Sequence, residues 1–324
     1  MKPGVVAALL VASIGALLVG VVTGPVTLPP GEIWDALKSA SAPAAPIVRD
    51  LRLPRVLLAF VVGGGLGLCG AALQALVRNP LADPYLLGLS GGAGLGAVIA
   101  IALGLTTVWG VPIAAFAGAI AALLLVYRLS LVQGRRLDSR VLLLAGVIVS
   151  ALCGALMSAI MALSSSATLR NAFLWLLGGF AGASWPALGI FAAYAVVPLL
   201  VLFATARWLD LLALGEESAR NLGLDVDRAR LVIYLATGLL TAASVATAGI
   251  IGFVGLVVPH AARRLLGPLH RPLLPAVFCG SGAFLVLADA VARTVARPVE
   301  LPVGVVTAIV GVPLFALLLR RTLA

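Results

Sequence analysis

Long apolar stretches recur along the whole sequence. They predict membrane-spanning segments at 4–24, 54–77, 85–105, 109–129, 141–163, 188–207, 229–249, 252–265, 273–294 and 301–319. A helix that crosses a bilayer needs ~20 consecutive apolar residues, which nearly all of these stretches supply. The eighth is short and contains Pro259, as is typical of a half-helix that does not fully cross. The sequence therefore predicts an all-α polytopic membrane protein with about ten transmembrane helices per subunit.

The composition agrees with this fold class. Hydrophobic residues make up 62% of the 324 residues and charged residues only 10%, whereas soluble domains have ~45–50% and ~25%. This excludes an ordinary cytosolic enzyme and a disordered chain. The first apolar segment resembles a signal peptide, but it is long, lacks a clear cleavage site and precedes further spans, so we expect it to be retained.

The distribution of basic residues predicts the orientation. With a cytoplasmic N-terminus and ten reversals of the chain, 15 of the 22 lysine and arginine residues are cytoplasmic and 7 lie outside. This bias follows the positive-inside rule, so we expect both termini in the cytoplasm. No basic run with interleaved aromatic residues occurs, and nucleic-acid binding is not expected.

Three connections are too long to be simple turns. Residues 25–53 and 164–187 are predicted outside, and residues 208–228 inside. The inner segment mixes apolar and charged residues at helical spacing, with Gly215 and Gly223 as breaks, which predicts one or two short amphipathic helices. Its five acids against two arginines favour a protein partner over anionic lipid, although a helix lying on the lipid surface is the alternative.

Glycine-rich motifs at 63–70 (GGGLGLCG) and 88–96 (GLSGGAGLG) place glycines four residues apart. This spacing makes a smooth groove for a neighbouring helix and indicates close helix packing. No GxxxxGK[ST] motif occurs, and lysine is found only at positions 2 and 38. Any ATP must therefore be bound by another chain.

Polar residues inside the spans are few. Asp289 is the only carboxylate well inside one, and its spacing predicts an i,i+4 pair with Arg293. His260 and His270 have no acid or cysteine cluster beside them, so no metal site is expected. The three cysteines lie in apolar stretches and are interpreted as packing residues. No catalytic, cofactor-binding or metal-binding residue is predicted, which disfavours the two alternatives, an ion-coupled secondary transporter and an integral membrane enzyme.

Several motifs together resemble the type II ABC-importer permeases that take up iron siderophores, haem and cobalamin. The resemblance extends over nearly the whole chain from about residue 50. It is carried by RLPRVLLAFVVGGGLGLCGAALQALVRNPLADPYLLGLSGGAGLGA (52–97), LLLAGVIVSALCGALM (142–157), WLLGGF (175–180), GIIGFVGLVVPHAAR (249–263) and ADAVARTVARPVELPVGVVTAIVGVPLF (288–315). The RNPLADP and GFVGLVVPH blocks are individually specific.

The resemblance implies a single permease domain over 1–324, which pairs with a second copy of itself around a central translocation path. Further partners would be two cytoplasmic ATPase subunits, which hold ATP and Mg²⁺, a periplasmic substrate-binding protein and the surrounding membrane lipid. The location would be the bacterial inner membrane. The chain itself would not be an enzyme and would bind no cofactor. Family frequency favours an iron-containing ligand, haem or a ferric siderophore, with cobalamin as the alternative.

The resemblance also assigns site residues. ATPase coupling is expected in 208–224, where Glu217-Ser218-Ala219 and Gly223 resemble an EAA-x-x-x-G pattern with serine in place of the first alanine. The coupling residues would be Leu212, Leu214, Glu216, Glu217, Ala219, Leu222 and Gly223.

Docking of the binding protein is expected at Arg52, Arg55 and Arg293, because guanidinium groups suit carboxylates. The alternative is that these arginines anchor helix ends among lipid headgroups. A cytoplasmic gate is expected at Asn79 and Leu81 in one loop and at Ser139 and Arg140 in another. Arg140 departs from the small polar residue that the family pattern implies.

Overall fold

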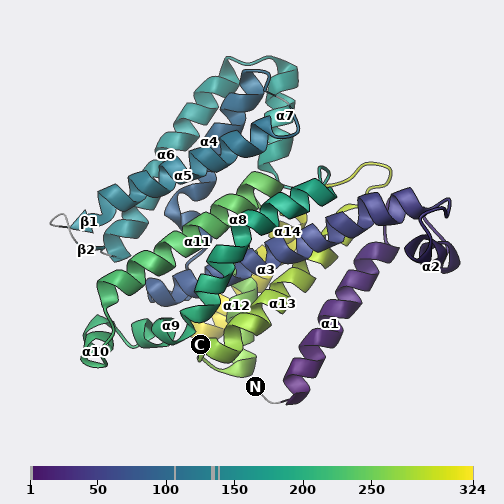
Figure 1. The fold of residues 1–324 in the computed structure, drawn as a ribbon. Coiled ribbons are helices and arrows are strands. Elements are labelled where there is room, and N and C mark those ends of the chain that lie inside the picture. The colour runs from purple at the N-terminus through teal and green to yellow at the C-terminus, as the bar shows by residue number, and fades with distance from the viewer. Residues whose placement is uncertain (1–2, 106, 133–135, 138, 324) are drawn as a thin grey trace.

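A computed structural model describes residues 3–105, 107–132, 136–137 and 139–323. Each predicted apolar segment coincides with a helix in it. These helices are α1 (Pro3–Val22), α3 (Leu53–Leu76), α4 (Leu89–Ala102), α5 (Gly110–Ser130), α6 (Ser139–Ala162), α8 (Trp185–Ala204), α11 (Val226–Ala248), α12 (Val254–Leu266), α13 (His270–Ala292) and α14 (Val303–Leu323). The long apolar runs thus form the main helices of the protein (Figure 1).

The shorter elements gather at the two ends of this bundle (Figure 1). One end, named here the α9–α10 face, carries α9 (Ala206–Ala213), α10 (Glu216–Asn221) and the antiparallel pair β1 (Leu131–Val132) and β2 (Arg136–Leu137), together with both chain ends. The other end, the α2 face, carries α2 (Pro30–Lys38), the π-helical segment η1 (Pro46–Arg52) and the loop 293–302.

Six stretches of the described chain are long and apolar enough to cross a membrane. They are Pro46–Leu76, Gly110–Ser130, Val141–Ala162, Trp185–Ala204, Val226–Ala248 and His270–Ala292. Three shorter apolar helices accompany them: Ala7–Val22, Leu89–Ala102 and Val303–Leu317. The chain is a multi-pass membrane protein, as its hydropathy predicts.

Helix α12 has 13 residues and is therefore only ~20 Å long, against ~30 Å for the hydrocarbon core. The chain reaches it from α11 through residues 249–253, where Gly249 (φ 69°) and Phe253 (φ 68°) adopt positive φ. It then returns to the α9–α10 face, where α13 begins. Helix α12 is thus too short to span the hydrocarbon core by itself, and a non-helical stretch precedes it.

Helix α3 lies at the centre, with nearly all of its residues buried. Its glycines allow this because neighbouring backbones come very close. A Cβ on Gly70 would lie 1.8 Å from the Gly255 carbonyl oxygen of α12. In the second glycine-rich motif, a Cβ on Gly92 would lie 2.4 Å from the Gly118 carbonyl oxygen of α5. The predicted packing role of both motifs is confirmed.

Two helices form inside connections that the sequence analysis describes only as long. Helix α2 covers nine residues and α7 (Ser166–Leu176) covers 11, which is too short for a clear period. Ser165 caps α7, because its Oγ accepts the Thr168 N–H at 3.3 Å. A 3₁₀ turn, η2 (Pro84–Leu87), precedes α4.

Candidate functional site

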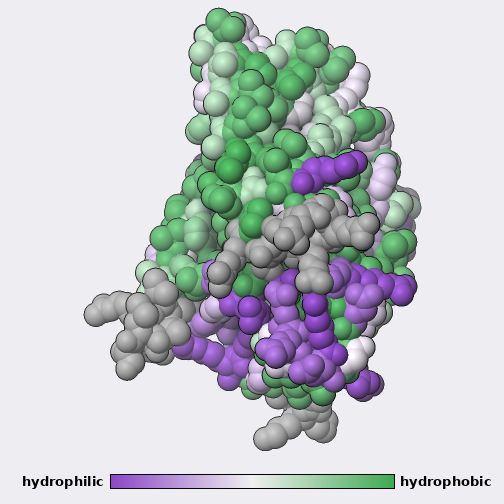
Figure 2. Space-filling view, turned by 90° about the vertical axis from the view of Figure 1, so that its left-hand side faces the viewer, coloured by the Kyte–Doolittle hydropathy of each residue, from purple (hydrophilic) through white to green (hydrophobic). Residues whose placement is uncertain are grey.

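Helices α9 and α10 form the segment predicted to couple to an ATPase, and α9 is amphipathic. Glu217 is exposed, and Leu214 and Leu222 are 64% and 61% exposed, whereas Ala219 is fully buried. Hydrophilic residues gather on this end of the molecule, and the flank beyond it is hydrophobic (Figure 2). An acidic residue and two leucines are therefore available to a partner protein.

Two of the predicted coupling residues contact the protein itself instead. Leu212 is 3% exposed, because it lies on the side of α9 that packs onto the protein's own core. It cannot fill a cleft in a partner, and that expectation is corrected. Glu216 forms an ion pair with Arg230 of α11, which fixes α10 to α11. Gly223 has φ 85°, so it ends the segment in the left-handed conformation that was expected.

A hollow of about 320 Å³ lies between this segment and the loop after α3. It is lined by Arg78 and residues 214–218. Arg78 itself has φ 51°, an uncommon conformation for a residue other than glycine. Its guanidinium faces the turn at Gly215, where a Cβ would lie 3.3 Å from Nη1. The hollow places a basic and an acidic side chain, Arg78 and Glu217, around one depression of the α9–α10 face.

Asn79 and Leu81, the first pair of predicted gate residues, lie in the loop between α3 and η2. The Asn79 side-chain oxygen accepts the Leu81 N–H at 2.9 Å, which holds the loop in a tight turn. Leu81 is 39% exposed. Ser139 and Arg140 begin α6 at the same face, but their side chains lie outside the described part of the chain. The gate remains a prediction.

The sequence analysis missed the two residues that hold this loop in place. Gln74, which is buried in α3, donates to the carbonyl oxygens of Ala82 at 3.3 Å and Gly255 at 3.2 Å. Its own oxygen accepts from Arg263 near the end of α12. Arg263 also donates to the Ala71 carbonyl oxygen at 3.2 Å. One glutamine therefore ties α3, the predicted gate loop and both ends of α12 together.

Asp83 ends the same loop. Its carboxylate accepts the Tyr85 N–H at 2.9 Å, which caps η2. Burial raises the pKa of Asp83 to about 6, and the hydrogen bond from Tyr85 offsets only part of this effect. The carboxyl group is therefore partly protonated in mildly acidic solution.

The α2 face holds a buried cluster of charges. Asp289 is 1% exposed, and its Oδ2 lies 2.9 Å from Arg293 Nε. This i,i+4 pair confirms the interpretation from sequence. Arg55 Nη2 contacts Asp289 Oδ1 and Glu300 Oε2, each at 2.9 Å. The four charges balance, which is how charged groups are tolerated inside a membrane protein.

Arg52 is buried beside this cluster, with 4% exposure. Its Nη1 donates to the carbonyl oxygens of Val21 and Val22, at 2.8 and 2.9 Å. Arg293 likewise donates to Thr23 and Gly20 at 3.1 Å. The two arginines thereby satisfy carbonyl groups at the end of α1, which have no partners within the helix.

The three arginines predicted to dock a binding protein therefore lie close together, but they are bonded inside the protein. Docking by Arg52, Arg55 and Arg293 stays a prediction, and it would require this network to open. Arg297, in the same loop as Glu300, is exposed. The sequence analysis did not select it, because charge alone does not separate an exposed arginine from a buried one.

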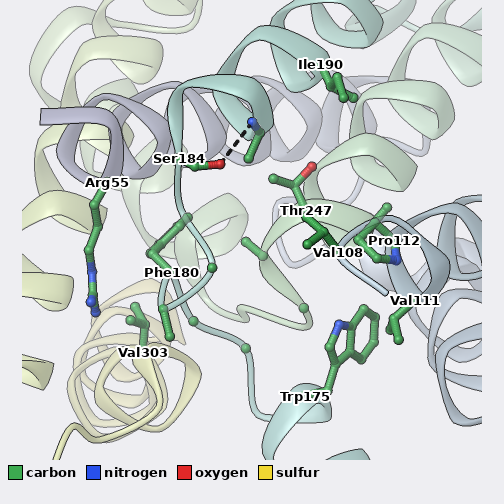
Figure 3. Close-up of a pocket in the computed structure, with 18 of the residues that line it drawn as sticks. Arg55, Val108, Val111, Pro112, Trp175, Phe180, Ser184, Ile190, Thr247 and Val303 are labelled. Carbon is green, nitrogen blue, oxygen red and sulfur yellow. Dashed lines mark hydrogen bonds between the residues drawn. The ribbon is translucent and has the colours of Figure 1, made fainter. Parts of the chain in front are cut away.

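A cavity of about 1060 Å³ opens between α5, α8 and α11, next to the cluster. Most of its lining is apolar, with aromatic side chains at 109, 116, 175, 180 and 194. Arg55 and Glu300 supply the charged groups of the lining, and Arg55 lies beside Phe180 and Val303, with Trp175 further along the wall (Figure 3). The cavity can hold a bulky, largely apolar group. Among the described residues, no three His, Cys, Asp or Glu side chains are grouped to hold a metal ion.

Comparison with known proteins identifies the family. The FecCD transport family matches residues 9–321. The cobalamin import system permease protein of Halobacterium salinarum is 45% identical over 299 residues, covering 90% of this chain and 80% of that protein. The vitamin B12 import system permease protein of Klebsiella pneumoniae is 42% identical over 309 residues, covering 94% and 90%.

A solved structure agrees over the whole chain. It is a metal-chelate type ABC transporter in an inward-facing conformation, with a TM-score of 0.87 and 30% identity. The match covers 99% of this chain and 100% of the other. The similarity thus extends from the sequence motifs to the arrangement of the helices. The chain belongs to the FecCD transport family and is a permease of the type II ABC-importer class.

Proposed function

We propose that this chain is the membrane-spanning permease subunit of an ATP-driven cobalamin importer. The observation that carries the proposal is the identity of 45% and 42% to two permeases named for cobalamin and vitamin B12 import, over at least 90% of this chain. The iron-containing ligand expected from family frequency has less support, because neither of these relatives is named for iron. The wide, mostly apolar cavity suits a bulky ligand of either kind.

The same proposal covers orientation and partners. The α9–α10 face is cytoplasmic, since the basic residues concentrate there, and α9 and α10 contact separate ATPase subunits that hydrolyse ATP. A substrate-binding protein delivers the ligand at the α2 face, and a second copy of the chain completes the translocation path. Exposed leucine, valine and isoleucine side chains along α6 support a partner copy or lipid on that side.

The test is ligand-dependent transport in proteoliposomes that contain the permease, its ATPase and its binding protein. We expect the binding protein loaded with cobalamin to stimulate ATP hydrolysis several-fold and to drive cobalamin uptake. Haem and ferric siderophores are tested in the same assay as the alternative ligands. Uptake of an iron ligand without uptake of cobalamin would overturn the substrate, and ATP-independent uptake would overturn the ATP-driven importer.

A further inference from the structure

Helix α13 begins without a cap from its own segment. The residue before it, Leu269, has an apolar side chain and makes no capping hydrogen bond. The first N–H groups of a helix have no partner inside it and need an acceptor from elsewhere. On the same face, α11 meets this need locally, because Asp225 accepts the Arg228 N–H at 3.1 Å.

Asp210 of α9 supplies the missing acceptor from 60 residues away. Its Oδ1 accepts the His270 backbone N–H at 2.8 Å and lies 2.7 Å from His270 Nδ1. A carboxylate at this position also interacts favourably with the helix dipole. The His270 side chain is only 3% exposed, whereas the Asp210 side chain is 25% exposed, so the contact is shielded from water on the histidine side. One carboxylate on α9 therefore holds both the backbone and the side chain of the first residue of α13.

The first turn of α13 depends on this contact more than an ordinary helix start would. Pro272 and Pro275 lie within its first six residues. Pro275 has no N–H to donate to the carbonyl of Arg271, which loosens the first turn from the rest of the helix. Asp210 thus fixes a turn that the helix itself holds weakly.

The contact joins two parts of the molecule that the chain does not join directly. Helix α9 follows α8 after one residue, and α10 leads into α11, so motion of the pair has covalent routes into those two helices. Helix α13 has no such link to α9, and the two pack against each other. With 23 residues, α13 extends ~35 Å and carries Asp289 of the buried charge cluster near its far end.

We propose that Asp210 and His270 form a transmission joint that carries motion of α9 and α10 into α13. A push by the ATPase subunits on the α9–α10 face then displaces α13, and with it the arginine cluster and loop 293–302 of the α2 face. Asp210 and His270 are positioning residues in this mechanism. The inference rests on the proposed function in so far as an ATPase acts on α9 and α10, but it does not depend on which ligand is carried.

The test measures motion at the far end of α13 in the complete complex with its ATPase. Spin labels go on Val299, in the loop after α13, and on Leu163, after α6; these side chains are 66% and 91% exposed. We expect ATP to change the distance between the labels in the otherwise wild-type complex. The Asp210→Ala variant should lose this change. The control, Asp225→Ala, removes a cap of the same kind from α11 and should keep it.

Hydrolysis supplies the second readout. We expect the ratio of binding-protein-stimulated to basal ATP hydrolysis to fall at least fivefold in Asp210→Ala and in His270→Ala. In His270→Asn this ratio should return to at least half of the wild-type value, because the asparagine amide NH₂ can donate to Asp210 in place of Nδ1–H. A role in stability alone predicts no such recovery of coupling. If Asp210→Ala does not assemble, the same two measurements are made on His270→Ala. This variant loses the side-chain contact but keeps the backbone N–H of residue 270 that donates to Asp210.

Two results would overturn the joint: an ATP-driven distance change that persists in both alanine variants, or a wild-type complex in which ATP changes no distance. Failure of the proposed function is seen separately. If an iron ligand rather than cobalamin is carried, the substrate is wrong, yet the distance change and its loss in Asp210→Ala still support the joint.

Discussion

Arg293 Nε lies 2.9 Å from Asp289 Oδ2, one turn earlier in α13, and neither side chain is more than 2% exposed. Asp289 also binds Arg55, so a single carboxylate serves two buried guanidinium groups. Breaking a buried ion pair by removing one partner costs more than the pair contributes, because the remaining charge is left uncompensated.

We therefore expect Asp289→Asn to destabilise the permease by about 3–5 kcal/mol. A thermal unfolding scan in detergent checks this. Arg170→Ala is the control, because Arg170 is exposed on α7 and its loss should change the melting temperature little. An Asp289→Asn variant that melts with the wild type would show that the cluster does not stabilise the fold.

Docking of a binding protein should depend on Arg297, because it is exposed at the α2 face. The charge reversal Arg297→Glu should weaken association about tenfold at low salt and make the residual binding less salt-sensitive. Titration of the binding protein against permease in nanodiscs measures both effects. Arg52→Glu tests the docking role that the sequence analysis predicted for Arg52. Weaker binding with an unchanged melting temperature would support that role. Unaltered affinity in both variants would exclude docking through these arginines.

Coupling through α10 can be tested at Glu217 and Gly223. Glu217→Lys reverses an exposed charge, and Gly223→Val forces a β-branched residue to φ 85°, at a cost of ~1 kcal/mol or more. We expect both variants to insert into the membrane, but the ATPase should co-purify poorly or hydrolyse ATP without uptake. Glu32→Lys, on α2 at the opposite face, is the charge control for co-purification of the ATPase. Normal co-purification and normal uptake in both variants would favour a helix that only lies on lipid.

The predicted gate, if it lies at the start of α6, implies a crosslink between two copies of the chain. Cysteines at Ser139, in a background with Cys279→Ser, should crosslink in one nucleotide state and separate in another. Electrophoresis without reducing agent measures the dimer band. A band of constant intensity in every state would show a static contact, and its absence in every state would place the dimer axis elsewhere.

Asp83 should make stability depend on pH. Its pKa in the folded protein is raised to about 6 from an ordinary value of 3.8, so the folded state binds more protons than the unfolded state between these values. Stability therefore falls as pH rises from about 4 to about 6 and stays low above that.

Asp83→Asn keeps the oxygen that accepts from Tyr85 and removes the ionisation. At pH 7.5 we expect this variant to be more stable than the wild type, by at most about 3 kcal/mol in unfolding free energy. Near pH 4 the two proteins should melt at the same temperature. Melting curves across this range check the prediction. A difference that does not change with pH would rule out ionisation of Asp83 as its cause.

The helices that the sequence analysis predicted are those with a local signal. Twenty apolar residues specify a spanning helix, glycines four apart specify a contact, and the spacing of Asp289 and Arg293 specifies a pair, all within a few turns. The features that it missed join distant positions. Gln74 meets Arg263 across 189 residues, and Asp210 meets His270 across 60. Nothing in the local pattern around these residues names their partners.

Exposure was the other quantity that the sequence could not supply. Leu212 and Leu214 are two positions apart and chemically identical, yet one is buried and the other is 64% exposed. The arginines of the α2 face differ in the same way. The spacing of residues along a helix shows which of them share a face. Only the packed structure shows which face the protein covers with its own residues.

The buried charge cluster also has a consequence for synthesis. Arg55 is made 234 residues before Asp289, and a ribosome adds ~5–20 residues per second. For roughly 10–50 s, each newly made chain holds an arginine in the first turn of α3 before either of its two partner carboxylates has been synthesised. Lipid headgroups or the insertion machinery must accommodate this charge in the meantime. A chain truncated before α13 would keep it permanently unmatched, a chemical mark by which an unfinished permease differs from a finished one.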